Sequence, residues 1–164
     1  MGDRPETRHV VLRAHGLRQF EQSRELRRDQ VGLGDPVRGD QTQWLEPGET
    51  QACDRYLAVM DSLRLDLNRG LFLGLEDFEC HFALYPPGAF YRRHLDRFRD
   101  DDRRMVSTVL YLNQAWQPGD GGELRLFLGE RDVLDVAPVA GSLVVFLSGE
   151  VPHEVLATQR ERLS

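Results

Sequence analysis

The chain has 164 residues, with 21 basic and 27 acidic side chains and a formal net charge of −6. This length allows one domain with a hydrophobic core, and not two. All the basic residues are arginine, so enzymes that need a lysine Schiff base, a P-loop lysine or a lysine general base are excluded. The negative charge argues against a general nucleic-acid-binding protein, which would present a basic face.

We expect a cytoplasmic protein without membrane contact. No run approaches 18 consecutive apolar residues, and the N-terminal sequence MGDRPETRHVV contains no apolar signal segment. Two cysteines, Cys53 and Cys80, allow one disulfide bond at most and no disulfide framework. The chain also lacks isoleucine, which like lysine has AT-rich codons, and this indicates a GC-rich, bacterial genome.

The N-terminal third of the chain has little regular patterning. Residues 1–16 are polar, and residues 17–30 (LRQFEQSRELRRDQ) are a candidate for a short charged helix. Residues 31–49 are rich in Gly, Pro and Asp, which is typical of a loop, and we expect one short strand in it near residues 43–45.

A stronger pattern follows between residues 50 and 70. Thr50 is a suitable N-cap, because its hydroxyl can accept a hydrogen bond from the first helical turn. Apolar residues then recur at three- and four-residue spacing and define one face, made of Cys53, Tyr56, Leu57, Met60, Leu63 and Leu67. This pattern predicts an amphipathic helix with Gly70 at its C-terminal end.

From residue 71 onward the pattern changes to that of strands. The β-rich runs are residues 78–85, 105–113, 123–128, 131–136 and 142–147. Turn sequences such as QPGDGG and PVAG separate these runs. Helices followed by at least five short strands predict an α+β fold, in which a sandwich or jelly roll of two sheets is backed by N-terminal helices.

Two histidines and one aspartate form the candidate site. His94 and Asp96 are two residues apart after an apolar segment, and on a strand they would point to the same face. His153 follows a second apolar run, SLVVFLSGEVP. Two imidazoles and one carboxylate, with no thiolate, are typical of non-haem Fe(II) oxygenases. A His-x-Asp pair alone is weak evidence, and we interpret the other histidines as structural (His81) or surface residues (His9, His15).

The neighbours of these residues strengthen the interpretation. Four segments carry it, namely YPPGAFYRRHLD (85–96), VLYLN (109–113), GGELRLF (121–127) and PHEV (152–155). In order and spacing the chain resembles the prolyl 4-hydroxylase type of Fe(II)/2-oxoglutarate-dependent dioxygenase over roughly residues 38–164. It is most similar to bacterial relatives of the hypoxia-inducible-factor prolyl hydroxylases. The resemblance implies a double-stranded β-helix, or jelly roll, as the core.

The resemblance also implies roles for individual residues. His94, Asp96 and His153 would bind Fe(II), and O₂ would react there with the co-substrate 2-oxoglutarate. Arg162 would hold the far carboxylate of 2-oxoglutarate, since a guanidinium grips a carboxylate with two hydrogen bonds. Arg160 is its nearest competitor for that role. The other residues implied for the 2-oxoglutarate pocket are Tyr111, which would bond the same carboxylate, Tyr85 and Leu124.

The expected substrate is a prolyl residue in a protein, and for a bacterial chain we expect a protein of the translation machinery such as an elongation factor. Candidate substrate contacts are Arg38, Asp40, Trp44 and Arg104, with the loop 97–104 either a peptide contact or a solvated hairpin. The resemblance also implies oxygen sensing and ascorbate as a reductant. The alternatives are hydroxylation of a free amino acid or small metabolite, and a non-catalytic metal-binding module.

We expect one dioxygenase domain over residues 1–164, with an N-terminal part (1–37) and a catalytic jelly roll (38–164), as a monomer or weak dimer. In the family a further strand follows the arginine, whereas Arg162 is followed here by two residues. The family's N-terminal helix and strand are also shortened in this sequence, so we expect the domain to be shortened at both ends.

Overall fold

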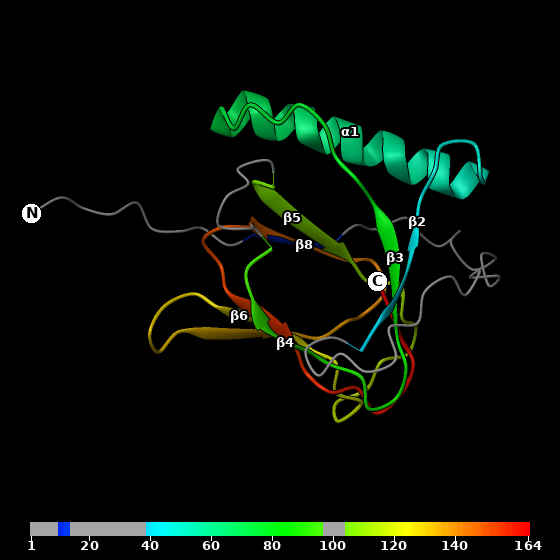
Figure 1. Ribbon diagram of the computed structural model, residues 1–164, viewed down its shortest axis with the longest axis vertical. Coiled ribbons are helices and arrows are strands. Elements are labelled where there is room, and N and C mark those ends of the chain that lie inside the picture. Colours follow the sequence, from blue (N-terminus) through cyan, green and yellow to red (C-terminus); the bar gives the residue numbers. More distant parts are fainter. Residues whose placement is uncertain (1–9, 14–38, 97–103) are drawn as a thin grey trace, which may run out of the picture.

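The computed structural model describes residues 10–13, 39–96 and 104–164 (Figure 1). The helix expected over residues 17–30 lies outside these ranges, as do His9, His15, Arg38 and most of the loop 97–104. The described part contains one helix and ten strands, in the order β1 Val10–Arg13, β2 Gln41–Trp44, α1 Gln51–Leu71, β3 His81–Tyr85, β4 Tyr91–His94, β5 Val106–Leu110, β6 Leu124–Phe127, β7 Val133–Val136, β8 Ser142–Leu147, β9 His153–Val155 and β10 Arg162–Leu163.

The helix begins as the sequence predicts. The side chain of Thr50 accepts a hydrogen bond from the backbone N–H of Cys53. Its end differs from the prediction, because α1 runs through Gly70 and stops at Phe72, which has a left-handed backbone with φ 55°. Asn68 explains the difference: its side-chain amide exchanges two hydrogen bonds with the backbone of Leu75 and so fixes the chain reversal beyond Gly70.

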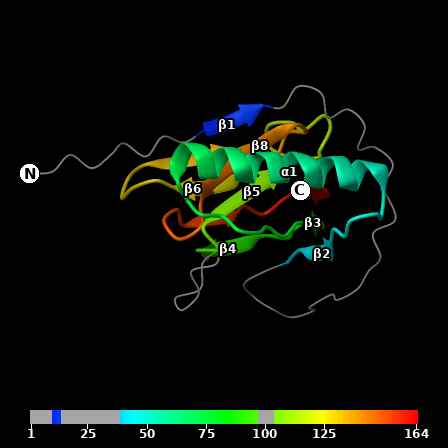
Figure 2. The ribbon, with the colours of Figure 1, turned by 90° about the horizontal axis from the view of Figure 1, so that it is seen from above.

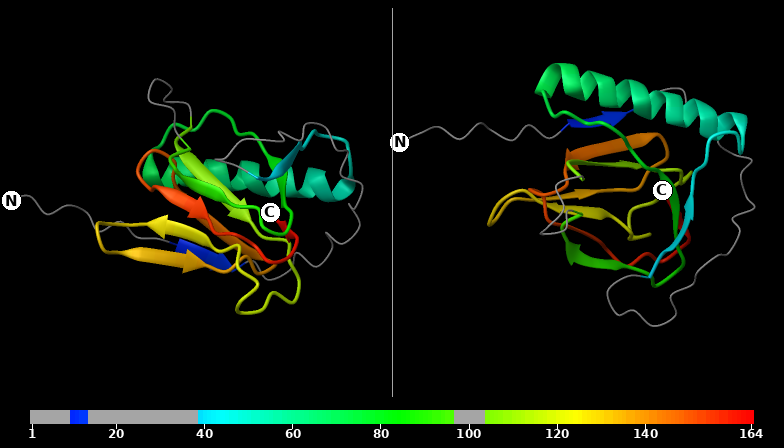
Figure 3. Two further views of the ribbon diagram at one scale, coloured as in Figure 1. Left: turned by 60° about the horizontal axis from the view of Figure 1, so that its bottom comes forward. Right: turned by 45° about the horizontal axis from the view of Figure 1, so that its top comes forward.

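The strands form three antiparallel sheets (Figures 1 and 3). One has the strand order β4-β9-β6-β7, and the other two have the orders β1-β8-β5 and β10-β3-β2. The buried apolar cluster between them includes three residues expected at the site, Tyr85, Tyr111 and Leu124. The α+β fold with a jelly-roll core is thus confirmed, and the site residues are part of its core.

The helix α1 covers the outer face of the sheet that contains β5 and β8 (Figures 1 and 2). Met60 of the helix packs against Leu110 of β5 and Leu143 of β8 in a second apolar cluster. Of the N-terminal helices that the sequence predicts, the described residues contain this one. This helix, the one that the described residues contain, is not apolar enough over its length to cross a lipid bilayer.

Four short strands are absent from the sequence prediction. Three of them, β1, β9 and β10, have two to four residues each, too few to show a period of two. The fourth, β4, has the sequence YRRH, in which two arginines hide the strand pattern. All four exist because a partner strand pairs with them: β8 with β1, β9 with β4, β6 with β9, and β3 with β10.

Candidate metal centre

Strand pairing brings the two candidate histidine ligands together. The antiparallel strands β4 and β9 place His94 directly opposite His153. Directly opposite residues have Cβ atoms about 5 Å apart, so both imidazoles project from the same face of the sheet. The register shifts between Tyr91 and His94, and this irregularity lies immediately before the ligand.

Asp96 reaches the same point from outside the strand. On a continuous strand Asp96 would share a face with His94, but β4 ends at His94 and Asp96 lies in the bend that follows. Its Oδ1 is 3.4 Å from Nε2 of His94 and 3.6 Å from Nε2 of His153. One ligand atom from each of the three residues lies within 4.8 Å of the others, so the three can hold one metal ion.

The backbone fixes which imidazole nitrogen faces the metal. Nδ1 of His94 lies 2.7 Å from the carbonyl oxygen of Arg92, and Nδ1 of His153 lies 3.1 Å from that of Val151. A carbonyl can only accept, so each Nδ1 carries the proton and each Nε2 is left with a lone pair for the metal. The two rings are also held by packing, against Tyr91 and Phe146 respectively.

Asp96 is present as a carboxylate. Burial would favour its neutral form, but the neighbouring side chains of His153, His94 and Ser107 outweigh burial and hold the pKa of Asp96 well below its usual range. The Ser107 hydroxyl donates to Oδ2 of Asp96 over 2.5 Å. The site therefore offers two imidazole nitrogens and one anionic oxygen, which suits a divalent ion such as Fe(II).

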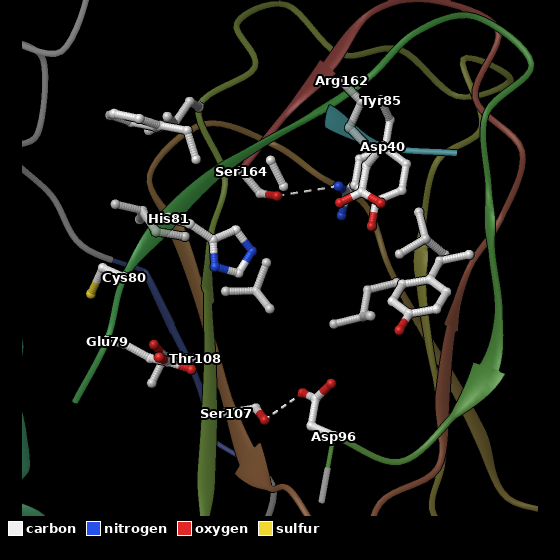
Figure 4. Close-up of a pocket in the computed structure, with 18 of the residues that line it drawn as sticks. Asp40, Glu79, Cys80, His81, Tyr85, Asp96, Ser107, Thr108, Arg162 and Ser164 are labelled. Atoms are coloured by element: carbon white, nitrogen blue, oxygen red, sulfur yellow. Dashed lines mark hydrogen bonds between the residues drawn. The ribbon is translucent and has the colours of Figure 1, made fainter. Parts of the chain in front are cut away.

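A cavity of about 250 Å³ extends from this centre into the core. Figure 4 shows Asp96 near one end of it and Arg162 near the other. The expected site residues that line it are His94, Asp96, His153, Arg162, Tyr85, Leu124, Asp40 and Arg104. The cavity therefore connects the metal centre with Arg162, and a co-substrate bound in it would extend from one to the other.

Arg162 is a buried cation. Its side chain is 1% exposed, its Nε donates to the carbonyl of Gly122, and one terminal nitrogen lies 3.3 Å from Oγ of Ser164. No carboxylate among the described residues forms an ion pair with it. A buried arginine without an anion is costly, which indicates that a ligand supplies the negative charge. By contrast Arg160, its competitor, is exposed and bonds Asp120.

Tyr111 provides a second unsatisfied group next to Arg162. The residue is fully buried, and its hydroxyl has no hydrogen-bond partner among the described residues. Its ring centroid lies 5.2 Å from the guanidinium carbon of Arg162. Burial raises the pKa of Tyr111 to about 12, although Arg162 acts in the opposite direction through its positive charge and its closeness to the hydroxyl. A neutral hydroxyl beside a cation is suited to donate to a carboxylate.

Gly122 leaves room for this arrangement. Its backbone has φ +70°, and a Cβ atom built on it would lie 3.0 Å from Cδ of Arg162 and 3.1 Å from Cβ of Thr158. A larger residue would therefore be strained and would push Arg162 away from its position.

The expected substrate residues are distributed over the surface near the cavity. Asp40 and Arg104 line it, and Arg104 donates to Oε1 of Glu79 over 2.5 Å. Trp44 does not line it; half-exposed, it packs edge-on against His81. His81 itself lines the cavity, and both cysteines are free.

Sequence reasoning missed Ser107, Val109, Tyr91 and Ser148 near the site. Ser107 and Val109 could have been found, because Tyr111 was expected at the site and, in an extended segment, the residues two and four positions before it lie on the same face; both belong to β5, which ends one residue before Tyr111. Ser148 gives no such signal, since it follows β8 in a turn and reaches the site only through Ser107.

Both the sequence and the fold of this chain match those of known proteins. Residues 80–164 match the family model of the 2OG-Fe(II) oxygenase superfamily. A crystal structure of a Pseudomonas putida prolyl-4-hydroxylase is 73% identical with a TM-score of 0.77, over 80% of this chain and 71% of that chain.

Two more distant structures agree. A Trichoplax adhaerens prolyl hydroxylase, in complex with a hypoxia inducible factor oxygen degradation domain peptide, is 31% identical with a TM-score of 0.64, over 77% of this chain and 60% of that one. A Phytophthora capsici prolyl 4-hydroxylase is 27% identical with a TM-score of 0.63, over 75% and 45% of the two chains. The protein therefore belongs to the 2OG-Fe(II) oxygenase superfamily, among the oxygenases of the prolyl 4-hydroxylase type.

Proposed function

We propose that this oxygenase hydroxylates a prolyl residue in a protein substrate. One observation carries the proposal: the buried, unneutralised Arg162 and the unpartnered hydroxyl of Tyr111 share the core with the triad His94, Asp96 and His153. These groups fit 2-oxoglutarate and Fe(II), and the chain is 73% identical to a prolyl-4-hydroxylase.

In this proposal His94, Asp96 and His153 are the metal ligands, through Nε2, Oδ1 and Nε2. Iron bound there would couple the oxidative decarboxylation of 2-oxoglutarate, to succinate and CO₂, to hydroxylation of the substrate carbon. Each histidine keeps its proton on Nδ1, bonded to a backbone carbonyl, so the metal-facing nitrogens stay unprotonated.

Arg162, Tyr111, Tyr85 and Leu124 hold the co-substrate. Arg162 binds its far carboxylate and Tyr111 donates a hydrogen bond to the same group, which satisfies the two groups that the protein leaves unmatched. Tyr85, whose ring centroid lies 4.8 Å from the guanidinium carbon of Arg162, and Leu124, which is buried, line the cavity and exclude water.

The substrate is the finer part of the proposal. Support comes from Asp40 and Arg104 beside the cavity and from the peptide bound to the Trichoplax adhaerens relative. Trp44 and Arg38, which lies outside the described residues, complete the proposed peptide contacts. We further propose a translation factor as the substrate, a role in oxygen sensing, a cytoplasmic location and ascorbate as a reductant.

The test is to incubate the protein, Fe(II) and 2-oxoglutarate in air with bacterial protein extract and to search the tryptic peptides by mass spectrometry. The proposal predicts a gain of one oxygen atom on a proline, dependent on 2-oxoglutarate, and absent with His153→Ala. Succinate formation stimulated only by free amino acids or metabolites would instead support the small-molecule alternative. No succinate with any substrate, from folded protein that binds metal, would support a non-catalytic module.

A further inference from the structure

The three metal ligands are positioned in two different ways. His94 and His153 are paired across β4 and β9, and backbone carbonyls orient their rings. Asp96 lies in a bend after β4, where no strand pairing fixes it. A carboxylate on a bend can rotate and can present one or two oxygens, so something else must set its orientation.

We propose that Ser107 and Ser148 are positioning residues that orient the Asp96 carboxylate for the metal. Ser107 Oγ lies 2.5 Å from Oδ2 of Asp96 and 2.8 Å from Oγ of Ser148. The other oxygen, Oδ1, is the one that faces both histidines. The inference rests on the metal role proposed above for Asp96.

The direction of these hydrogen bonds follows from chemistry. The carboxylate of Asp96 can only accept, so the Ser107 proton goes to Oδ2. Ser107 then has only lone pairs left for Ser148, so Ser148 must be the donor in that contact. The result is a directed chain from Ser148 through Ser107 to Asp96, in which each bond polarises the next.

Burial makes this chain well defined. Ser148 is fully buried, and Ser107 is the only described partner of its hydroxyl. Its backbone N–H donates to the carbonyl of Met105, just before β5, which holds it beside Ser107. A fully buried hydroxyl must find a partner, so Ser148 stabilises one rotamer of Ser107.

The consequence is a carboxylate that offers a single oxygen. With Oδ2 bonded to Ser107, Oδ1 is the oxygen that would bind a metal ion, so Asp96 would act as a ligand through one oxygen. Loss of the Ser107 hydroxyl frees Oδ2 to rotate toward the ion.

The test measures the Kd of Mn(II) by EPR titration and the d–d absorption spectrum after Co(II) loading, neither of which requires turnover. We expect Ser107→Ala to weaken Mn(II) binding by about 10-fold or more and to change the Co(II) spectrum, since outer-shell partners of ligands are worth about 10- to 100-fold. Ser107→Thr keeps the hydroxyl and should restore both. Ser62→Ala, at an exposed serine of α1, is the matched control and should change neither.

Ser148 supplies the second, independent variant. Ser148→Ala should weaken Mn(II) binding less than Ser107→Ala does. The double variant should bind Mn(II) as tightly as Ser107→Ala alone, because Ser148 acts through Ser107. This comparison keeps the proposal testable if one single variant folds poorly.

Two results would overturn the inference: Mn(II) affinity and Co(II) spectrum unchanged in Ser107→Ala, or equal losses in Ser107→Ala and Ser107→Thr. Failure of the proposed function looks different, because wild-type protein and Asp96→Ala would then bind Mn(II) equally. Additive losses from the two serines would contradict the directed chain.

Discussion

The two ends of the cavity differ in how far the protein satisfies its own polar groups. At the metal end, each histidine Nδ1 bonds a carbonyl and each Asp96 oxygen has a neighbour. At the Arg162 end, a buried guanidinium has no described carboxylate partner, and the Tyr111 hydroxyl has no described partner at all. The metal end is therefore preorganised by the protein, whereas the other end is completed by the anion it binds.

Removal of a metal ligand should have the largest effect. We expect His153→Ala to weaken Mn(II) binding by at least about 100-fold, since even outer-shell changes cost about 10- to 100-fold. His81→Ala, which removes a cavity-lining histidine outside the triad, should leave the Kd of Mn(II) within about twofold. Isothermal titration calorimetry measures both, and equal losses would show that the effect is not specific to the triad.

Arg162→Lys should weaken 2-oxoglutarate binding by about 10-fold or more and leave Mn(II) binding intact. A lysine keeps the charge but loses the planar pair of donors that matches a carboxylate. Arg160→Lys is the control, because Arg160 is exposed and bonds Asp120. The Kd of 2-oxoglutarate for Mn(II)-loaded protein checks this, and comparable effects of the two substitutions would contradict the assignment.

Tyr111→Phe should have opposite effects on binding and on stability. The variant loses a hydrogen bond to the ligand, which we expect to weaken 2-oxoglutarate binding by about 3- to 10-fold. It also removes a buried, unpartnered hydroxyl, so the ligand-free protein should unfold at the same or a higher temperature.

Tyr56→Phe is the matched control for that stability change. Its hydroxyl interacts with the side chains of Cys80 and Thr108 within the protein, so its loss should lower the free energy of unfolding by about 1 kcal/mol. Calorimetry of both ligand-free variants measures the difference. A fall in the melting temperature of Tyr111→Phe like that of Tyr56→Phe would show that Tyr111 has a partner within the protein.

The smallest effect on the site should come from the helix cap. Thr50→Ala removes the acceptor for the Cys53 N–H and should cost about 1 kcal/mol of stability. Cys53 and Tyr56 of α1 line the cavity, but α1 contains none of the residues proposed to bind 2-oxoglutarate, so we expect the Kd of 2-oxoglutarate to change little. Chemical denaturation and ligand titration test the two parts, and a large loss of ligand affinity would mean that the start of α1 helps to position the co-substrate.

The sequence predicted features that depend on interactions between residues close in the chain, and it missed features that depend on distant residues. The start of α1 depends on Thr50 and Cys53, which are three residues apart, and sequence patterns predict such local features. Its end depends on hydrogen bonds between Asn68 and Leu75 across a chain reversal, so the helix end predicted at Gly70 was wrong. The pairing of His94 with His153 and the reach of Ser148 toward Ser107 join distant segments, and no local pattern encodes them.

The candidate site was predictable from the sequence because the order and spacing of four segments resemble one enzyme family, whereas the His-x-Asp pair alone is weak evidence. His94, Asp96, His153 and Arg162 could be named before their geometry was known, and the structure places all four around one cavity. Ser148, which reaches Asp96 only through Ser107, is a common residue type in a turn and stands out only once the fold is known.

The most direct test is an absorption spectrum recorded without oxygen. Fe(II) and 2-oxoglutarate are added to the folded protein under nitrogen, and the weak visible metal-to-ligand charge-transfer band is followed. We predict that the band appears in the wild-type protein, is absent in His153→Ala, and requires more 2-oxoglutarate in Arg162→Lys. Folded wild-type protein that shows no band at saturating Fe(II) and 2-oxoglutarate would contradict the assignment of the metal centre and the cavity.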